Sequence, residues 1–481
     1  MVFSSNLFIF YFLPLALLAH AVCWRLLPRA ARHLGLLLSS YAFYAWSNPA
    51  LVLILLFSTA VDYACGLALD RPGASERRRR LAVTASVATN LGVLGFFKYF
   101  NFGVETWNRA LGAAGLEGYA VEDVLRVALP LGISFYTFQS MSYTLDVYRG
   151  RARALANPID FACYVAMFPQ LVAGPIIRFR EVADQLQERT HGLEKAARGA
   201  AFFCLGMAKK ILLANPCGQV ADLAFEARAL TMLDAWLGIV AYAFQIYFDF
   251  SGYTDMAIGL GLILGFQFPK NFDSPYRATS ITDFWRRWHM SLSRWLRDYL
   301  YIPLGGNRRG RGRTYVNLMI VMLLGGLWHG AAWTFVVWGL LHGLLLTAER
   351  LARDRRAGRP SAGRLHAVRV AWTFLLVLIT WVFFRAETLP DAIAYLVAML
   401  GQGAPPGEAA AAAALVSGVL RAPYLLATLA LSALIVWRAP QTWDYVERLS
   451  PPKVAVLLAL LTTSLLMMNV QGYNPFLYFI F

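Results

Sequence analysis

The sequence predicts an all-helical protein that crosses a membrane many times, and three observations lead to this fold class. The 481 residues are 58% hydrophobic and only 15% charged, whereas soluble domains are roughly 45–50% apolar and about 25% charged. The apolar residues form long runs, and basic residues gather between them. A disordered chain is excluded, because no soluble or unfolded chain carries this excess. We expect a single domain, 1–481, with roughly ten to twelve spans and some interfacial or re-entrant helices around a central cavity.

The first apolar stretch is expected to be a span and not a cleavable signal peptide. No basic residue precedes it, and Leu7–Cys23 runs into Arg25, Arg29 and Arg32 without a small-residue cleavage site. Its basic flank is predicted to lie in the cytoplasm and the N-terminus outside. Further apolar stretches continue the pattern of spans: Leu34–Trp46, Ala50–Leu69, Leu81–Phe100, Val127–Leu145 and Val454–Val470.

The net charge of +16 would suggest a nucleic-acid partner in a soluble protein. Here the basic residues lie between apolar stretches, so we interpret them as the signal that orients a membrane protein. The expected partner is therefore the lipid bilayer and not nucleic acid. Segments 77–80, 270–313 and 350–369 are rich in Lys and Arg and are predicted inside. Segment 101–126, with four acids against two bases, and the C-terminus are predicted outside.

Two segments resist a simple assignment. Lys209 and Lys210 fall within the apolar stretch Ala200–Leu213, where a lysine pair at mid-depth would be costly. That stretch is expected either to place them at the headgroups or to place them in a water-filled cavity, and both options stay open. Ala404–Ala414 is a low-complexity connection. No internal repeat is visible, so an inverted-repeat transporter has no support.

Residues 242–343 are the most informative block, because aromatic, basic, Gly and Pro residues crowd together there. Asp249 and Asp255 lie six positions apart in a stretch of membrane character. Ionisable groups in such stretches face a protein interior or a watery cavity. They are interpreted either as paired structural residues or, with polar neighbours, as the lining of a substrate passage. The candidate lining residues are Asp249, Ser251, Tyr253, Asp255 and Trp328.

The segment that follows has helical spacing of its apolar residues, at Trp285, Trp288, Leu292, Trp295 and Tyr299, and predicts one amphipathic helix. Thr282 or Asp283 is the expected N-cap. Its arginines either anchor the helix to anionic lipid or hold the phosphates of a nucleotide-bearing donor. A basic loop, Pro303–Arg313, follows, and its Gly-Gly pair is not a Walker motif. The candidate donor-binding residues are Arg286, Arg287, Arg294, Arg297, Arg308 and Arg309.

His329 is the strongest catalytic candidate. The 15 residues from Thr314 to Trp328 span about 22 Å as a helix, which places His329 well inside a hydrocarbon core. Gly325, Gly326 and Gly330 beside it permit close approach of a backbone or ligand. A neutral buried imidazole is either a satisfied core histidine or a general base for a hydroxyl. His342 is expected to be structural.

Several long motifs closely resemble the membrane-bound O-acyltransferase superfamily, and most closely its branch of bacterial alginate O-acetyltransferase membrane subunits. They cover nearly the whole chain and weaken over 350–450. The matching stretches are MVFSSN at 1–6, LPLGISFYTFQSMSYTLDVYRG at 129–150, FPQLVAGPIIRF at 168–179, YFDFSGYTDMAIGLG at 247–261, FWRRWHMSLSRWLRDYLYIPLGGNRRG at 284–310, LLGGLWHGAAWTFVVWGLLHG at 323–343 and FLYFIF at 476–481.

The resemblance implies that an acetyl group passes from cytoplasmic acetyl-CoA through a catalytic core in the inner membrane to an extracellular or cell-wall polysaccharide. An alginate-like exopolysaccharide is the preferred candidate for this acceptor. His329 matches the family's catalytic histidine. His289, 40 positions earlier, matches its second polar position, although spacing alone reads His289 as an inner-face residue. The branch also implies an exported SGNH-type partner, and a donor substrate in place of a bound cofactor.

The expected chemistry is attack of a hydroxyl on a thioester carbonyl. Neutral His329 removes the proton, while His289 orients the base or supports the oxyanion. No GxSxG elbow, Cys/His pair or metal-binding motif is present in the sequence. The alternatives are transfer of D-alanyl or another acyl group, and a transporter that uses Asp249, Asp255, Lys209 and Lys210 with His329 as a proton relay. A glycosyltransferase lacks a DxD-like motif.

Overall fold

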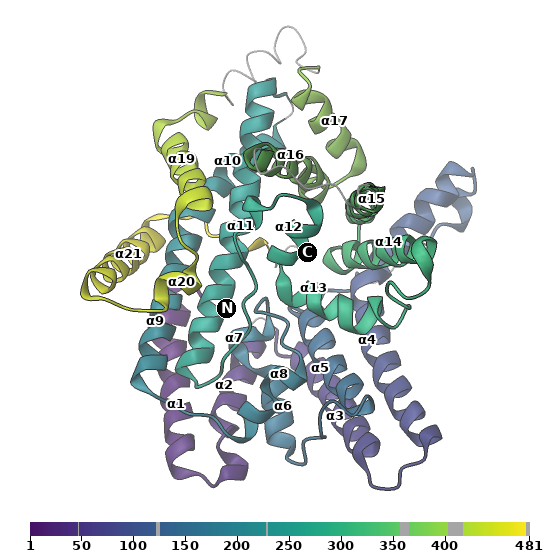
Figure 1. Ribbon diagram of the computed structural model, residues 1–481, viewed down its shortest axis with the longest axis vertical. Coiled ribbons are helices and arrows are strands. Elements are labelled where there is room, and N and C mark those ends of the chain that lie inside the picture. Colours follow the sequence, from purple (N-terminus) through teal and green to yellow (C-terminus); the bar gives the residue numbers. More distant parts are fainter. Residues whose placement is uncertain (47, 122–125, 228, 356–364, 403–416, 478–481) are drawn as a thin grey trace. The chain divides into compact units, whose positions relative to one another are not determined.

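The computed structural model describes residues 1–46, 48–121, 126–227, 229–355, 365–402 and 417–477 (Figure 1). Helices and their connections make up these described ranges, and no strand occurs in them. The all-helical fold class is therefore confirmed. The chain divides into two compact units, one formed by Met1–Gly192 with Leu264–Phe268 and the other by Leu193–Ile263 with Pro269–Phe481.

The first unit is a set of helices whose polar interior is centred on one carboxylate. Asp62 of α3 is completely buried. It accepts hydrogen bonds from Ser86 Oγ of α4 at 2.6 Å, from Asn90 Nδ2 of α4 at 2.7 Å and from Ser140 Oγ of α5. These bonds join three helices around a group that would be costly to bury alone. The helices of this unit are η1 Leu7–Phe12, α1 Leu13–Leu26, η2 Arg29–Ala31, α2 Leu34–Ala45, α3 Leu51–Asp70, α4 Glu76–Ala113, η3 Glu117–Tyr119, α5 Ile133–Tyr148, α6 Pro158–Ala166, α7 Phe168–Leu171 and α8 Phe179–Gln187.

The second unit is built around α11, a 32-residue helix, Met232–Ile263, most of whose residues are buried. Figure 1 shows α9 beside it, and the two backbones touch at glycines. A Cβ at Gly199 or Gly206 of α9 would lie 2.5 Å from the carbonyl oxygen of Gly259 or Gly252 of α11. The other elements are α9 Leu193–Ala208, η4 Lys209–Ala214, α10 Asn215–Glu226, η5 Pro275–Arg277, α12 Ile281–Arg287, α13 Met290–Leu296, η6 Arg297–Tyr301, α14 Gly310–His329, α15 Trp333–Arg355, α16 His366–Arg385, α17 Leu389–Met399, α19 Pro423–Arg438, α20 Thr442–Val446 and α21 Pro451–Val470.

The lysine pair lies in the π-helical turn η4 and is buried against α11. Lys209 Nζ is 2.6 Å from Asp255 Oδ2, and Lys210 Nζ is 2.7 Å from Asp249 Oδ1. The side chains of the second pair are only 4% and 2% exposed. The C-terminal segment completes this cluster, because Lys210 also donates to the carbonyl of Pro475 and Asp249 Oδ2 accepts from the Leu477 N–H at 2.9 Å. The lysines are thus neutralised by protein carboxylates.

Seven described helices are long and apolar enough to cross a membrane. This number, which rests on length and composition, is smaller than the ten to twelve spans expected. Shorter apolar helices are present as well, at Leu389–Met399 and Pro423–Arg438. The low-complexity connection Ala404–Ala414 lies outside the described residues, as do parts of segments 101–126 and 350–369. The seven are Leu7–Leu26, Leu51–Asp70, Glu76–Ala113, Leu193–Glu226, Trp333–Asp354, His366–Arg385 and Pro451–Val470.

Candidate active site

The predicted amphipathic helix over 282–299 is wrong in one respect, because it is broken at His289. Helix α12 ends at Arg287 and α13 begins at Met290, and between them His289 has left-handed backbone angles of φ 42° and ψ 54°. Such a conformation costs a non-glycine residue roughly 1–2 kcal/mol. The break turns the side chain of His289 inward, so that it is completely buried.

The N-cap of α12 lies two or three residues earlier than expected. Ser280 Oγ accepts a 3.0 Å hydrogen bond from the Asp283 N–H, so Ser280 and not Thr282 or Asp283 caps the helix. Asp283 instead pairs with Arg287 at 2.9 Å. Serine is as good an N-cap as either predicted residue, and the two extra residues start the helix one half-turn sooner.

A buried asparagine holds the break. Asn271 Oδ1 accepts from the Ser291 N–H at 3.0 Å and from Ser291 Oγ at 2.9 Å, and it lies 3.3 Å from His289 Nδ1. The Asn271 carbonyl accepts from the Met290 N–H at 2.9 Å. These bonds satisfy the backbone on both sides of the left-handed residue. Sequence reasoning did not find Asn271, because a single asparagine in a connection carries no spacing signal.

Burial decides the charge of His289. The ring is completely buried, and removal from water lowers the pKa of His289 to about 3, because the imidazolium form loses its hydration. His289 is therefore a neutral imidazole at physiological pH.

The two predicted histidines lie together. His329 is the last residue of α14, 4% exposed, and its ring centroid is 6.4 Å from that of His289. Trp328 contacts both rings: its ring centroid is 5.0 Å from that of His329 and 6.0 Å from that of His289. Trp338 and Phe384 pack edge-on against His329, each at 5.2 Å. An aromatic shell thus surrounds a pair of imidazoles.

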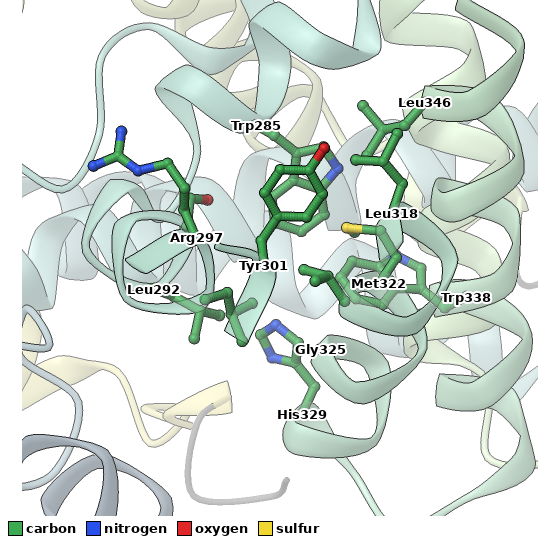
Figure 2. A pocket seen from close by; sticks show the side chains of 13 residues that line it. Trp285, Leu292, Arg297, Tyr301, Leu318, Met322, Gly325, His329, Trp338 and Leu346 are labelled. Carbon is green, nitrogen blue, oxygen red and sulfur yellow. The ribbon is translucent and has the colours of Figure 1, made fainter. Parts of the chain in front are cut away.

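A cavity of about 190 Å³ opens beside His329. Figure 2 shows the imidazole pointing into the space between Leu292 and Met322. Gly325 borders this space, and a Cβ there would meet only Leu296 Cδ1, at an ordinary contact distance of 3.6 Å. The cavity is lined mainly by apolar side chains, with the lining residues Trp285, Leu292, Ser293, Leu296, Arg297, Tyr301, Leu318, Val321, Met322, Gly325, His329, Trp338 and Leu346.

Comparison with known proteins agrees with this geometry. The family model of membrane-bound O-acyltransferases matches residues 125–387, which include both histidines and the whole cavity wall. The chain is also 43% identical to the probable alginate O-acetylase AlgI of Azotobacter vinelandii over the full length of both proteins. The chain belongs to the membrane-bound O-acyltransferase family.

Other members of the family are similar over less of their length. A peptidoglycan O-acetyltransferase of Helicobacter pylori is 37% identical over 83% of this chain and 80% of its own length. A teichoic acid D-alanyltransferase of Streptococcus thermophilus is 29% identical over 50% of this chain and 63% of its own. This membrane-bound O-acyltransferase is therefore a multi-pass helical enzyme that transfers acyl groups to hydroxyls.

The arginines proposed for donor binding occupy different places in the O-acyltransferase. Arg297 lines the cavity and pairs with Asp298 at 2.8 Å. Its side chain is 59% exposed, and its guanidinium points away from the cavity in Figure 2. Arg287 is held by Asp283 and the carbonyl of Asp273. Arg286, Arg308 and Arg309 are exposed, and Arg294 is half-buried.

The polar residues of α11 are not brought to this cavity. Asp249 and Asp255 are the partners of Lys210 and Lys209, and Tyr253 stacks on Phe476 at 4.7 Å. Asp249, Ser251, Tyr253 and Asp255 do not line the cavity beside His329. Trp328 is not a lining residue either, but its ring packs against both imidazoles. Their proposed role as passage lining stays a prediction.

The cavity wall contains two polar atoms that sequence reasoning missed. Ser293 Oγ and Trp338 Nε1 are buried and have no hydrogen-bond partner among the described residues. Trp285 Nε1, by contrast, donates to His342 Nδ1 at 3.2 Å, so His342 supports the wall from behind. The regular tryptophan spacing could have pointed to Trp285, but nothing in the sequence indicated the free donors.

Proposed function

We propose that this O-acyltransferase takes an acetyl group from acetyl-CoA at the cytoplasmic face of the inner membrane and passes it outward for O-acetylation of an alginate-like exopolysaccharide. The observation that carries the proposal is the pairing of His329 and His289 at 6.4 Å beside an apolar cavity. Relatives named as alginate O-acetylases match the chain over its full length, which favours this polymer over others.

His329 acts as the general base. It removes the proton from the attacking hydroxyl, whose oxygen forms a bond to the thioester carbonyl carbon as the bond to sulfur breaks. The His329 imidazolium then gives this proton to the sulfur, so that CoA leaves as the thiol and the histidine is neutral again. Because the wall of the cavity is largely apolar, water is kept from the thioester and hydrolysis is suppressed. The neutral ring of His289 orients this reaction from its position against Trp328 and His329.

The developing negative charge on the carbonyl oxygen needs hydrogen-bond donors. Trp338 Nε1 and Ser293 Oγ are suited to this, because both residues line the cavity and both atoms lack a partner within the described part of the chain. The phosphates of CoA are expected to bind outside the apolar part, by Arg297, whose side chain is 59% exposed, and by the exposed Arg308 and Arg309. Arginine binds phosphate in two places with its planar fork.

The orientation that goes with this function has segments 77–80, 270–313 and 350–369 inside, and segment 101–126 and both termini outside. The polymer side is served by an exported SGNH-type partner that completes the transfer. Single cysteines at Leu116 and Pro303, both exposed, test the orientation with an impermeant reagent. Labelling of Leu116→Cys alone from outside supports it, and equal labelling of both contradicts it.

Two alternatives make different predictions. A D-alanyl transferase would use another activated acyl group, and a transporter would consume no thioester. The four charges that a transporter would couple, on Lys209, Lys210, Asp249 and Asp255, are already neutralised in pairs, which favours an enzyme.

The test is complementation of an alginate-producing bacterium that lacks its own O-acetylase. We expect the chain to restore O-acetyl groups on the secreted polymer, and membranes from that host to release free CoA from acetyl-CoA. Polymer without O-acetyl groups, together with no release of CoA, would contradict the proposal.

A further inference from the structure

We infer that Asn271 is the positioning residue of the histidine pair, holding the proton of His289 on Nδ1 and leaving the lone pair on Nε2 for the reaction. This inference rests on the proposed function, in which His289 acts beside His329. Among the described residues, the hydrogen bonds of Asn271 run to Thr254 and to residues 289–291, and Asn271 is not a lining residue of the cavity, so its effect is exerted through His289.

The hydrogen bonds define which atom of Asn271 faces His289. A backbone N–H can only donate, and the Ser291 N–H points at Asn271 Oδ1 at 3.0 Å. That atom is therefore the amide oxygen, which can only accept. At the other end of the amide, Asn271 Nδ2 donates to Thr254 Oγ1 of α11 at 3.4 Å, which holds the same orientation.

The protonated nitrogen of His289 follows from this. An amide oxygen 3.3 Å from Nδ1 requires Nδ1 to carry the hydrogen. The nearby hydroxyl does not compete, because Ser291 Oγ lies 2.9 Å from Asn271 Oδ1 and 3.5 Å from His289 Nδ1. In a neutral imidazole the other nitrogen, Nε2, then holds the lone pair.

Asn271 also sets the direction of the ring. Its carbonyl binds the Met290 N–H and its side chain binds the Ser291 N–H, so it secures the left-handed turn that carries His289 inward. Among the described residues, Phe250 of α11 and Trp328 and His329 of α14 pack against the ring, and Ser291 lies beside its Nδ1. Of these four residues, His329 is the titratable one.

The experiment compares Asn271→Asp, Asn271→Ala and the wild type in two measurements. The first is ¹⁵N NMR of the purified full chain in detergent with labelled histidine, in which His289→Gln identifies the signal of His289. The second is the pH dependence of kcat and KM for acetyl-CoA in membranes of the complemented host. Aspartate keeps the acceptor but adds a negative charge that stabilises the imidazolium, whereas alanine removes the acceptor.

We expect the wild-type signal to show the proton on Nδ1. Asn271→Asp should move the acidic limb of the pH profile upward by about one pH unit or more and keep its activity at alkaline pH. Asn271→Ala should lower kcat about 10- to 100-fold with little change in KM. Asn215→Asp is the matched control, because this buried asparagine bonds to the C-terminal segment, and it should leave the acidic limb unmoved.

A wild-type ring protonated on Nε2 would overturn the inference, as would an acidic limb of Asn271→Asp that coincides with that of the wild type. The NMR measurement needs no turnover. If the wild type releases no CoA and acetylates no polymer, the proposed function fails, while the position of the proton still decides the inference.

Discussion

Trp285 Nε1 donates a 3.2 Å hydrogen bond to His342 Nδ1 and thereby ties α12 to α15 at the wall of the cavity. His342 is completely buried, and its ring also packs against Trp338 at 4.8 Å. One face of the reaction space is therefore held by a histidine that does not reach it. This explains the second histidine of the LWHGAAWTFVVWGLLHG motif.

Replacement of His342 should loosen this wall. His342→Ala leaves a buried indole N–H without its acceptor, so we expect a loss of about 1–3 kcal/mol of stability, seen as a lower midpoint of thermal unfolding in detergent. Trp285→Phe removes the donor and part of the ring that packs on Trp338 and His342, so it should lower the midpoint as well. His366→Ala is the control, because His366 is exposed at the start of α16. Equal midpoints for His342→Ala and His366→Ala would contradict the supporting role.

Loss of His329, the proposed general base, should abolish transfer without unfolding the protein. His329→Ala is expected to remove polymer O-acetylation in the complementation assay while the amount of protein in the membrane stays the same. His289→Ala should also impair transfer, but less completely. Near-normal acetylation by His329→Ala would show that another group removes the hydroxyl proton.

The Lys210–Asp249 pair should behave as a structural unit. Lys210→Met leaves Asp249 as an unpaired buried charge, which costs about 3–5 kcal/mol, so its unfolding midpoint should fall steeply. The double variant Lys210→Met with Asp249→Asn removes both charges and should recover much of this loss. If the double variant is no better than the single one, the ion pair is not what holds these residues together.

The stability of the protein should fall in acid partly because of His289. Its pKa is about 3 in the folded state, against about 6.5 in an unfolded chain. Between these two values the unfolded state binds a proton that the folded state does not bind. The contribution of His289 to the free energy of unfolding is therefore complete above pH 6.5 and is lost progressively as the pH falls toward 3. The limiting slope is about 1.4 kcal/mol per pH unit.

His289→Gln removes that contribution. The unfolding midpoints of the wild type and His289→Gln, followed from neutral pH downward, should converge. The reason is that acid lowers the stability of the wild type more than that of the variant. Parallel curves would mean that the buried ring is already charged, or that it does not titrate on unfolding.

Neutralising Arg308 and Arg309 together should weaken the use of the donor. Loss of two phosphate partners is expected to raise KM for acetyl-CoA roughly tenfold with membrane abundance unchanged. Arg77→Gln with Arg78→Gln, in the exposed base-rich segment of the first unit, serves as the control and should leave KM unaltered. If KM is unaltered for both and only abundance falls, the arginines anchor the protein to lipid.

Much of the fold could be predicted, because spans and helix α14 depend on local composition. The sequence predicted a helix over the 15 residues from Thr314 to Trp328, and α14, Gly310–His329, contains all of them. The pairing of Lys209 and Lys210 with two aspartates could not be chosen in advance, because it depends on the rotation of η4 against α11 and on the C-terminal segment.

The site was only half visible in the sequence. Trp285, Trp288, Leu292, Trp295 and Tyr299 keep helical spacing across His289, so the pattern hid the break, and no Gly or Pro marked it. Left-handed conformation at a histidine is a tertiary effect, held by Asn271 from 18 residues away. The arrangement of the two imidazoles therefore needed either the fold or a family resemblance.

The bonds from Lys210 to the carbonyl of Pro475 and from the Leu477 N–H to Asp249 have a consequence for biosynthesis. A ribosome makes residues 475–477 after η4 and α11, which precede them in the chain. Until then, the buried side chains of Lys210 and Asp249 lack part of their hydrogen bonding. The ion pair between η4 and α11 is therefore fully satisfied only once a segment translated after both of these helices has folded back onto it.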